Sequence, residues 1–210
     1  MKITKLGHCC LLIETKGKRI LTDPGSYTAL EHVKLTYIDY ILFTHEHQDH
    51  FHVESLRDIL KINPQATIYN NNSVGELLSK ENIRHTNIKN GEVIFLGSVS
   101  VVGIGEKHAM MHNSMPLSEN IGFFIDGRLW YPGDAFTNPE RAVEILALPV
   151  SGPWMKISEA IDYAFLVKPK VAFPVHDGTR FGTSNALPAK LLPSQEIQFI
   201  VMKEGDSMDF

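Results

Sequence analysis

Four histidines stand close together in this 210-residue chain, at positions 45, 47, 50 and 52, directly after an apolar stretch at residues 38–44. The chain holds 10 histidines, so even spacing would place fewer than one in a window of that length. The central run reads Thr44-His45-Glu46-His47-Gln48-Asp49-His50. A buried strand that ends in so many imidazoles and carboxylates predicts a metal-binding loop, and the fold must hold that loop in place.

Spacing within the run divides its side chains between two ions. His45 and His47 are two residues apart, so in extended backbone both side chains point to the same side and can bind one ion. Asp49 and His50 are neighbours whose side chains must diverge, so they can reach a second ion close by. Imidazole and carboxylate suit Zn²⁺, Fe²⁺ and Mn²⁺, which leaves the identity of the metal open.

Short apolar and β-branched segments alternate with turn signals along the chain. We expect strands at residues 2–6, 9–14, 19–22, 38–44, 66–69, 93–96, 99–104, 121–125, 128–131, 145–149, 171–174 and 196–202. We expect helices at residues 54–61, 73–80, 139–143 and 158–167. In each half, hairpins precede an alternation of strand and helix, which favours two mixed sheets with helices outside. The expected fold class is α/β (α+β), a four-layer αββα sandwich in a single domain over residues 1–210.

Composition limits the partners and the compartment. The chain has 20 Lys and Arg against 24 Asp and Glu, a net charge of −4, and no basic block, so nucleic acid is not an expected partner. No apolar run approaches the ~18 residues of a membrane span, and no secretory signal is visible. Cys9 and Cys10 are neighbours, and they are expected to be small core residues in a reducing cytoplasm, with a redox or metal-binding role as the alternative. We expect a small-molecule substrate, and a homo-oligomer is compatible with the sequence.

The metal-binding run resembles the His-x-His-x-Asp-His signature of the metallo-β-lactamase fold hydrolases. It does not resemble the His-x-Glu arrangement of the flavodiiron branch, so the resemblance implies hydrolysis rather than redox chemistry. The segment Leu129-Trp130-Tyr131-Pro132-Gly133-Asp134 is similar to the strand–Gly-Asp motif of that family, whose aspartate bridges two metals. The segment Val171-Ala172-Phe173-Pro174-Val175-His176 is similar to its late Pro-x-His motif.

This resemblance implies a complete set of metal ligands. The first ion takes His45, His47 and a third histidine after the strand at 99–104; His108 fits by order and spacing, and His112 is the alternative. The second ion takes Asp49, His50 and His176, and Asp134 bridges the two. The implied cofactors are two divalent ions, with zinc expected and Mn²⁺ or Fe²⁺ also suited to these ligands.

A narrower resemblance covers the opening of the chain. The segments Gly7-His8-Cys9-Cys10-Leu11-Leu12-Ile13-Glu14 and Leu148-Pro149-Val150-Ser151-Gly152-Pro153 resemble the branch related to bacterial ascorbate-6-phosphate lactonase. That resemblance implies that His8 belongs to the catalytic site, beside Asp49, which also accepts a proton. Asp23, at a strand end before Pro-Gly, is either a turn former or a carboxylate that supports a ligand imidazole.

The sequence thus predicts a metal-dependent hydrolase, lactonase-like or phosphodiesterase-like. A hydroxide bridging two metals would attack a small ester, lactone or phosphorylated metabolite. The alternatives are a phosphodiesterase or nuclease of the same fold and a non-catalytic metal-binding domain. We expect loops 106–120 and 177–190 to select the substrate. Met110, Met111 and Met115 form either a lid or packing filler, and Trp154 either lines the pocket or packs.

Overall fold

The computed structural model describes residues 1–28, 30–178 and 185–210. Its strands form two seven-stranded sheets, ordered β14-β1-β2-β3-β4-β5-β6 and β13-β12-β11-β10-β9-β8-β7. The first sheet contains β1 (Lys2–Gly7), β2 (Cys10–Thr15), β3 (Lys18–Thr22), β4 (Tyr40–Phe43), β5 (Thr67–Asn70), β6 (Thr86–Asn87) and β14 (Ser207–Asp209). The second contains β7 (Val93–Leu96), β8 (Val99–Ile104), β9 (Gly122–Ile125), β10 (Leu129–Tyr131), β11 (Ile145–Pro149), β12 (Val171–Val175) and β13 (Gln198–Phe199).

Each sheet is half antiparallel and half parallel, as the two-part sequence pattern predicted. In the first sheet β1, β2 and β3 form an antiparallel meander, and β4 and β5 then add in parallel. In the second sheet β7, β8, β9 and β10 are antiparallel, and β11, β12 and β13 add in parallel. Because parallel neighbours point their carboxyl ends to the same edge, the loops after these strands gather at one end of the molecule.

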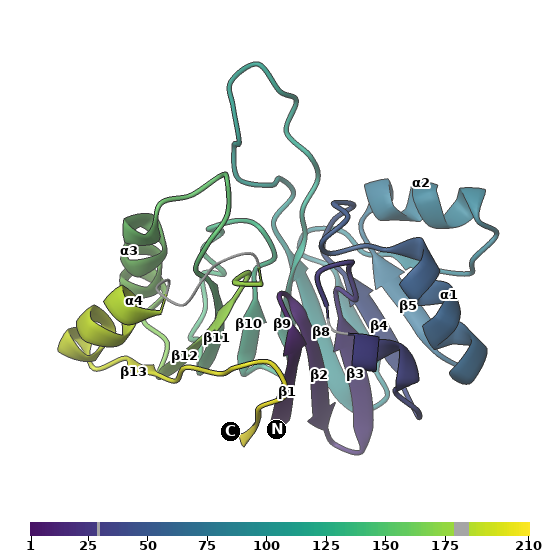
Figure 1. The fold of residues 1–210 in the computed structure, drawn as a ribbon, viewed down its shortest axis with the longest axis horizontal. Coiled ribbons are helices and arrows are strands. Elements are labelled where there is room, and N and C mark those ends of the chain that lie inside the picture. Colours follow the sequence, from purple (N-terminus) through teal and green to yellow (C-terminus); the bar gives the residue numbers. More distant parts are fainter. Residues whose placement is uncertain (29, 179–184) are drawn as a thin grey trace.

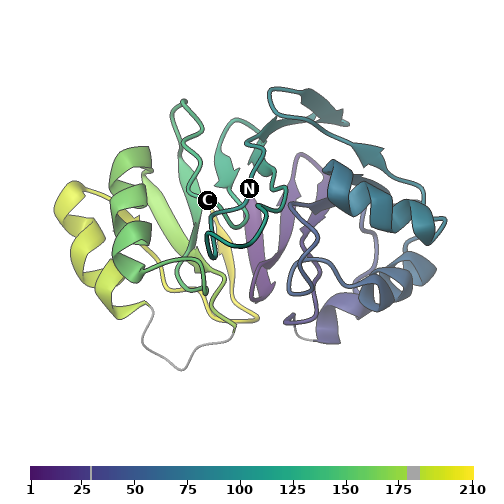
Figure 2. The ribbon, with the colours of Figure 1, turned by 90° about the horizontal axis from the view of Figure 1, so that it is seen from above.

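The sheets pack face to face, with helices on both outer sides (Figure 1; Figure 2). Helices α1 (Val53–Ile62) and α2 (Asn72–Lys80) cover the first sheet, and α3 (Ile157–Val167) and α4 (Ala186–Leu191) cover the second. Two short 3-10 helices, η1 (Leu30–Lys34) and η2 (Leu192–Gln195), complete the elements. This arrangement confirms the predicted αββα sandwich. Within the described ranges, no helix is long and apolar enough to cross a membrane.

Three apolar clusters hold the layers together. The central one lies between the sheets and includes Ile3, Leu11, Phe123 and Phe173. The other two lie between each sheet and its own helices. Alternation along β1 and β2 sends successive side chains into different clusters, which is why the two neighbouring cysteines separate. Cys9 belongs to the central cluster, and Cys10 packs on the helix side.

Several expected elements differ from the structure. Residues 139–143 are described and form no helix, because Glu140 has a φ of +53°, which a right-handed helix does not allow. The last expected strand, 196–202, shrinks to β13, since Glu196 turns the chain with a φ of +60°. The polar C-terminal segment contributes β14, an edge strand of three residues in which Met208 is the one apolar side chain. Helix α2 begins one residue before the expected Ser73 and α3 one residue before Ser158.

Candidate metal centre

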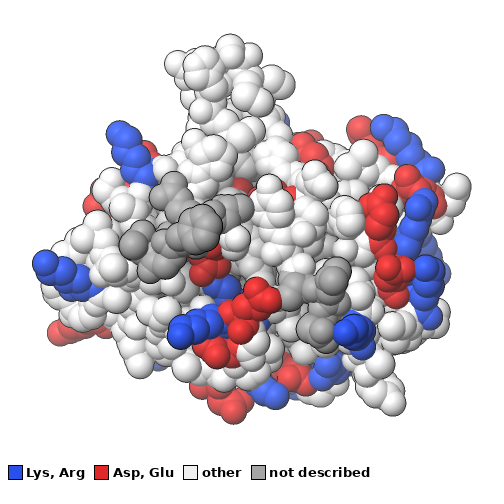
Figure 3. All heavy atoms as spheres, in the orientation of Figure 1, with Lys and Arg blue, Asp and Glu red and all other residues white. Residues whose placement is uncertain are grey.

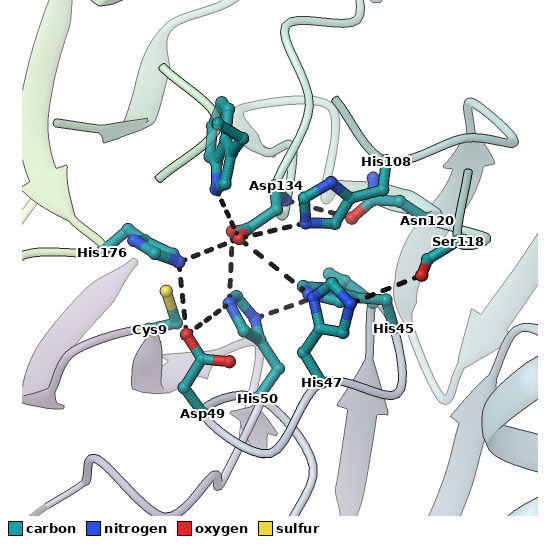
Figure 4. A network of polar contacts seen from close by, with 12 residues as sticks. Cys9, His45, His47, Asp49, His50, His108, Ser118, Asn120, Asp134 and His176 are labelled. Atoms are coloured by element: carbon teal, nitrogen blue, oxygen red, sulfur yellow. Dashed lines mark hydrogen bonds and ion pairs between the residues drawn. The ribbon is translucent and has the colours of Figure 1, made fainter. Parts of the chain in front are cut away.

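The candidate site lies where the carboxyl ends of strands from both sheets meet (Figure 4). The first sheet supplies the run that follows β4. The second supplies three residues from three different loops: one after β8, one after β10 and one directly after β12. Potential ligand atoms lie within 4.8 Å of one another in three overlapping groups: His45, His47 and His108; His45, His50 and Asp134; His8, Cys9, His50 and His176.

The loop after β4 owes its shape to a tight turn and a close neighbour. The amides of His50 and Phe51 both donate to the carbonyl of His47, at 2.9 and 2.7 Å. The segment after β3 packs directly against this turn, since a Cβ on Gly25 would come within 1.9 Å of the Asp49 carbonyl oxygen. Only a glycine allows that approach, so the turn and the segment support each other.

Two imidazoles of the first group are oriented by hydrogen bonds at Nδ1. The Nδ1 of His45 lies 2.9 Å from the Thr44 hydroxyl, and the Nδ1 of His108 lies 2.5 Å from the Ala109 carbonyl. A carbonyl only accepts, so His108 carries its proton on Nδ1 and has a lone pair on Nε2. The Thr44 hydroxyl donates to Asp23 at 2.7 Å, so it accepts from His45 and leaves Nε2 of that ring unprotonated as well.

His47 uses its ring differently. Its Nε2 lies 3.4 Å from the hydroxyl of Ser118, at the far end of the loop that begins near His108. When the ring donates from Nε2 to this hydroxyl, Nδ1 keeps the lone pair that an ion needs. The side chain is less buried than those of His45 and His108.

Asp23 is a buried carboxylate that supports the centre. Its Oδ2 accepts from Nδ1 of His50 at 2.8 Å and from the hydroxyl of Tyr131 at 2.7 Å. Its Oδ1 accepts from the amide of Thr44 at 2.8 Å. Asp23 thus has both of the roles considered for it: its carbonyl accepts from the Gly25 amide at 2.8 Å in the turn, and its carboxylate fixes the His50 ring with Nε2 toward the centre.

Asp134 occupies the middle of the cluster and is buried. Its Oδ1 lies 3.1 Å from Nε2 of His50. Its Oδ2 lies 2.8 Å from Nε2 of His176, 3.4 Å from Nε2 of His108 and 3.9 Å from Nε2 of His45. The carboxylate therefore faces histidines of both predicted groups, as a bridging ligand must.

Two further groups hold Asp134 in place. The indole Nε1–H of Trp154 donates to Oδ2 at 2.9 Å, and the Asp134 amide donates to the side chain of Asn120 at 3.0 Å. Sequence reasoning left Trp154 undecided and did not consider Asn120. Neither carries a sequence signal of its own, because each reaches Asp134 only through the packing of distant loops.

Asp49 and His8 form a second polar pair at the edge of the site. The Nδ1 of His8 accepts from the Gly178 amide at 3.1 Å, so its Nε2 carries the proton and donates to Asp49 Oδ2 at 3.1 Å. The same Oδ2 lies 3.4 Å from Nε2 of His176. With 21% of its side chain exposed, Asp49 is the carboxylate of the site that faces solvent, whereas Asp134 is 3% exposed.

The side chains fit divalent ions. The buried Nε2 atoms of His45, His50, His108 and His176, and Oδ1 of Asp134, have no hydrogen-bond partner within the described part of the chain. Unpaired buried polar atoms are costly, so several aimed at one point need a bound group. Ligands of one tetrahedral zinc ion lie about 3.3 Å apart. The contacts of Asp134 Oδ2 with His108 at 3.4 Å and of Oδ1 with His50 at 3.1 Å match that separation.

Protonation states follow from burial and from the facing charges. Burial, followed by the nearby His50 ring, lowers the pKa of His45 well below its usual value and keeps that imidazole neutral. Burial would raise the pKa of Asp134, but the rings of His50 and His176 outweigh it and hold that pKa well below the usual range. Neutral imidazole and ionised carboxylate are the forms that bind metal.

A small cavity of about 230 Å³ opens onto these residues. Its floor consists of His47, Asp49, His108, Asp134 and His176, and its walls are Met111, Pro153 and Trp154. Met111 comes from the segment between β8 and β9, which projects above the sheets in Figure 1. Met110 and Met115 of the same segment are about half exposed. Met111 thus lines the site, and Trp154 both lines it and binds Asp134.

The structure brings together all seven residues expected to bind metal, as well as His8. His112, the alternative to His108, is exposed and hydrogen-bonds to Ser114 in the projecting segment. Sequence reasoning missed the buried Lys5, whose ammonium binds Asp177 at 2.7 Å and the carbonyl of Pro174 at 2.9 Å. A signal was present, because alternation along β1 puts this lysine on the same face as buried Ile3.

Comparison with known proteins gives the same picture. Residues 2–176 match the family described as the Beta-lactamase superfamily domain. Protein Rv0786c of Mycobacterium tuberculosis is 38% identical over 182 residues, 84% of each chain. The UPF0173 metal-dependent hydrolase NEQ378 of Nanoarchaeum equitans is 30% identical over 192 residues, 85% of each chain.

A solved structure shares the fold. Igni18, a metallo hydrolase of Ignicoccus hospitalis, superposes with a TM-score of 0.78 at 20% identity, covering 100% of this chain and 98% of its own. The family match covers the strands, the histidine run and the loops that complete the metal centre. The chain therefore belongs to the metallo-β-lactamase superfamily, within its UPF0173 group of metal-dependent hydrolases.

Proposed function

We propose that the chain is a zinc hydrolase that binds two ions and acts on a small ester or lactone. The observation that carries this proposal is the central carboxylate of Asp134, flanked by two sets of unpaired imidazoles. One ion would be held by His45, His47 and His108, and the other by Asp49, His50 and His176, with Asp134 between them. Divalent ions bound there would lower the pKa of water and stabilise the negative charge that develops on the substrate.

Asp49 is the residue best placed to accept a proton. It is the most exposed carboxylate of the site, and it borders the cavity directly. The facing His176 and His8 hold its pKa well below the usual range despite its burial, so the carboxylate is ionised and ready to accept. The Nε2–H of His8 occupies Oδ2 and so fixes the orientation of the group. We assign proton acceptance to Asp49 and its orientation to His8.

The cavity favours an uncharged substrate with an apolar group. Met111, Pro153 and Trp154 form its walls, and the described residues that line it include no Lys or Arg to bind a phosphate. The tip of the projecting segment, residues 108–118, carries no Lys, Arg, Asp or Glu. Elsewhere on the face shown in Figure 3, basic and acidic side chains are interspersed. Part of the expected substrate loop at 177–190 lies outside the described residues.

The proposal also follows the resemblance of the opening segment to the lactonase branch. An ester and a lactone present the same carbonyl carbon to an attacking water, so one centre serves both. A phosphodiester is the alternative substrate, and apart from the metal ions the described residues that line the cavity offer it no cationic side chain.

The test is a hydrolysis screen with the zinc-loaded protein against lactone, ester, thioester and phosphodiester reporters. We expect turnover of carboxylic esters or lactones. The substitution Asp134→Ala should reduce it by more than the ~100-fold that loss of an outer metal contact costs. His112→Ala is the matched control, because it removes a nearby exposed histidine and should leave turnover unchanged. Turnover of the phosphodiester alone, or full activity of Asp134→Ala, would contradict the proposal.

A further inference from the structure

Cys9 lies at the metal centre, whereas its sequence context favoured a small core residue over a redox or metal-binding role. It follows His8 in the turn between β1 and β2, and its side chain is 1% exposed. In Figure 4 it stands next to His176 and Asp49. Its sulfur lies within 4.8 Å of ring nitrogens of His8, His50 and His176, which also lie within that distance of one another.

The backbone fixes Cys9 in this place. Its carbonyl accepts hydrogen bonds from the hydroxyl of Tyr131 at 2.7 Å and from the hydroxyl of Thr22 at 3.2 Å. The Tyr131 hydroxyl also lies 2.7 Å from Oδ2 of Asp23, the carboxylate that orients His50, so its one proton is shared between these two acceptors. The position of the thiol is thus tied to the same residues that position a metal ligand. Cys10, one residue later, faces the opposite side of the sheet and packs against the helices.

Not every residue of this group is free to bind an ion. Both ring nitrogens of His8 already have partners, Gly178 and Asp49. In contrast, Nε2 of His50 and both nitrogens of His176 are buried without a hydrogen-bond partner among the residues that the structure describes. Their close contacts are with the Asp134 carboxylate, and this group of buried ligand atoms without hydrogen bonds points to a bound ion independently of the cysteine, whose thiol lies beside them.

We propose that Cys9 supplies a thiolate ligand to the second ion, together with His50 and His176. This proposal rests on the two-ion centre proposed above. The thiol proton leaves to solvent as the sulfur–metal bond forms, so no oxidant or further reactant is needed. A sulfur ligand would make the second site softer than the first, which favours zinc, cobalt or cadmium over manganese.

The test is the absorption spectrum of the cobalt-substituted protein. Cobalt bound only by nitrogen and oxygen shows visible ligand-field bands, and a thiolate ligand adds a charge-transfer band in the near ultraviolet. We expect both features in the unmodified protein and loss of the near-ultraviolet band alone in Cys9→Ser. Cys10→Ala is the matched control and should keep the band. Because the chain has 2 cysteines, Cys9 is then the sole thiol, and the assignment does not depend on the folding of Cys9→Ser.

The possible failures are distinguishable. Visible bands without a charge-transfer band in the unmodified protein and in Cys10→Ala would overturn the thiolate ligand and leave the metal centre intact. A near-ultraviolet band that disappears in Cys10→Ala would overturn it too. A folded protein that takes up no cobalt would overturn the metal centre, and the thiolate ligand with it.

Discussion

The chemistry of this site depends on what each imidazole does with its second nitrogen. His45, His50 and His108 each use Nδ1 for a hydrogen bond within the protein, so each turns Nε2 toward the centre. Two of these bonds depend on Asp23, directly for His50 and through the Thr44 hydroxyl for His45. A single carboxylate outside the ligand set therefore orients one ligand of each proposed ion.

We predict that Asp23→Asn weakens metal binding by about 10- to 100-fold, because His50 loses its charged partner and the ring tautomer is no longer fixed. The measurement is zinc affinity by competition with a chelator, with circular dichroism to confirm that the variant is folded. An unchanged affinity in the folded variant would show that Asp23 does not act through His50.

The Trp154 indole is a second group that orients a proposed ligand, because it donates a hydrogen bond to Asp134. Trp154→Phe keeps an aromatic wall and removes only the Nε1–H. A hydrogen bond to a charged group contributes about 1.5–3 kcal/mol, so we predict roughly a 10-fold or greater loss of metal affinity. Trp130→Phe is the control, because it removes a buried indole hydrogen bond to Tyr163, which is not one of the proposed ligands. Equal effects of both substitutions on metal affinity would contradict a specific role for Trp154.

For single residues, the sequence predicts the metal ligands better than it predicts the residues that hold those ligands in place. The ligands in the run at 45–50 can be predicted because spacing along the backbone alone determines which side chains point to the same side. His108 was favoured over His112 by order and spacing, and the structure places His108 in the cluster and His112 in the exposed loop. Trp154 and Cys9 reach the centre only through tertiary packing, so no local pattern distinguishes them from core residues.

At the scale of elements, the site is built from loops pressed against each other. The segment after β3 touches the turn after β4 at Gly25, and the amide of Ser26 donates to the carbonyl of Gln48 at 2.9 Å. These contacts are between backbones, so neither loop can shift without moving Asp49 and His50.

We predict that Gly25→Ala destabilises the fold by about 1–3 kcal/mol through overpacking and weakens metal binding as well. The added methyl meets backbone atoms of Asp49 and His50, which can yield only by moving the ligands. Thermal unfolding and chelator competition would measure the two effects. A variant that loses stability and still binds metal normally would show that the turn tolerates displacement.

The elements that the sequence predicted wrongly share a cause. The segment 139–143 and the strand expected at 196–202 both contain a glutamate with a positive φ, at positions 140 and 196. A residue other than glycine adopts a positive φ where the surrounding structure requires it. Local amino-acid composition therefore gives little indication of such a residue. The edge strand β14 was missed because it is only three residues long, two of them polar and none of them fully buried. Strands that enter the core were readable from their apolar runs.

At the scale of the whole molecule, the centre lies on the seam between the two sheets. The run after β4 comes from one sheet, and His108, Asp134 and His176 come from the other. The ammonium of Lys5 in β1 also crosses this seam to Asp177, beside His176. Neither half holds a complete ligand set, so bound metal should tie the two sheets together and stabilise the fold.

The central claim is that the ligands gathered at this seam hold two ions, and the most direct test is the metal content of the purified protein by elemental mass spectrometry. Supplied with excess zinc and then desalted, the unmodified chain should retain about two ions, and His112→Ala should retain as many. Asp134→Ala should retain fewer, because it lacks the shared carboxylate. A folded chain that retains about one ion would contradict the two-ion centre, and one that retains none would contradict the metal site itself.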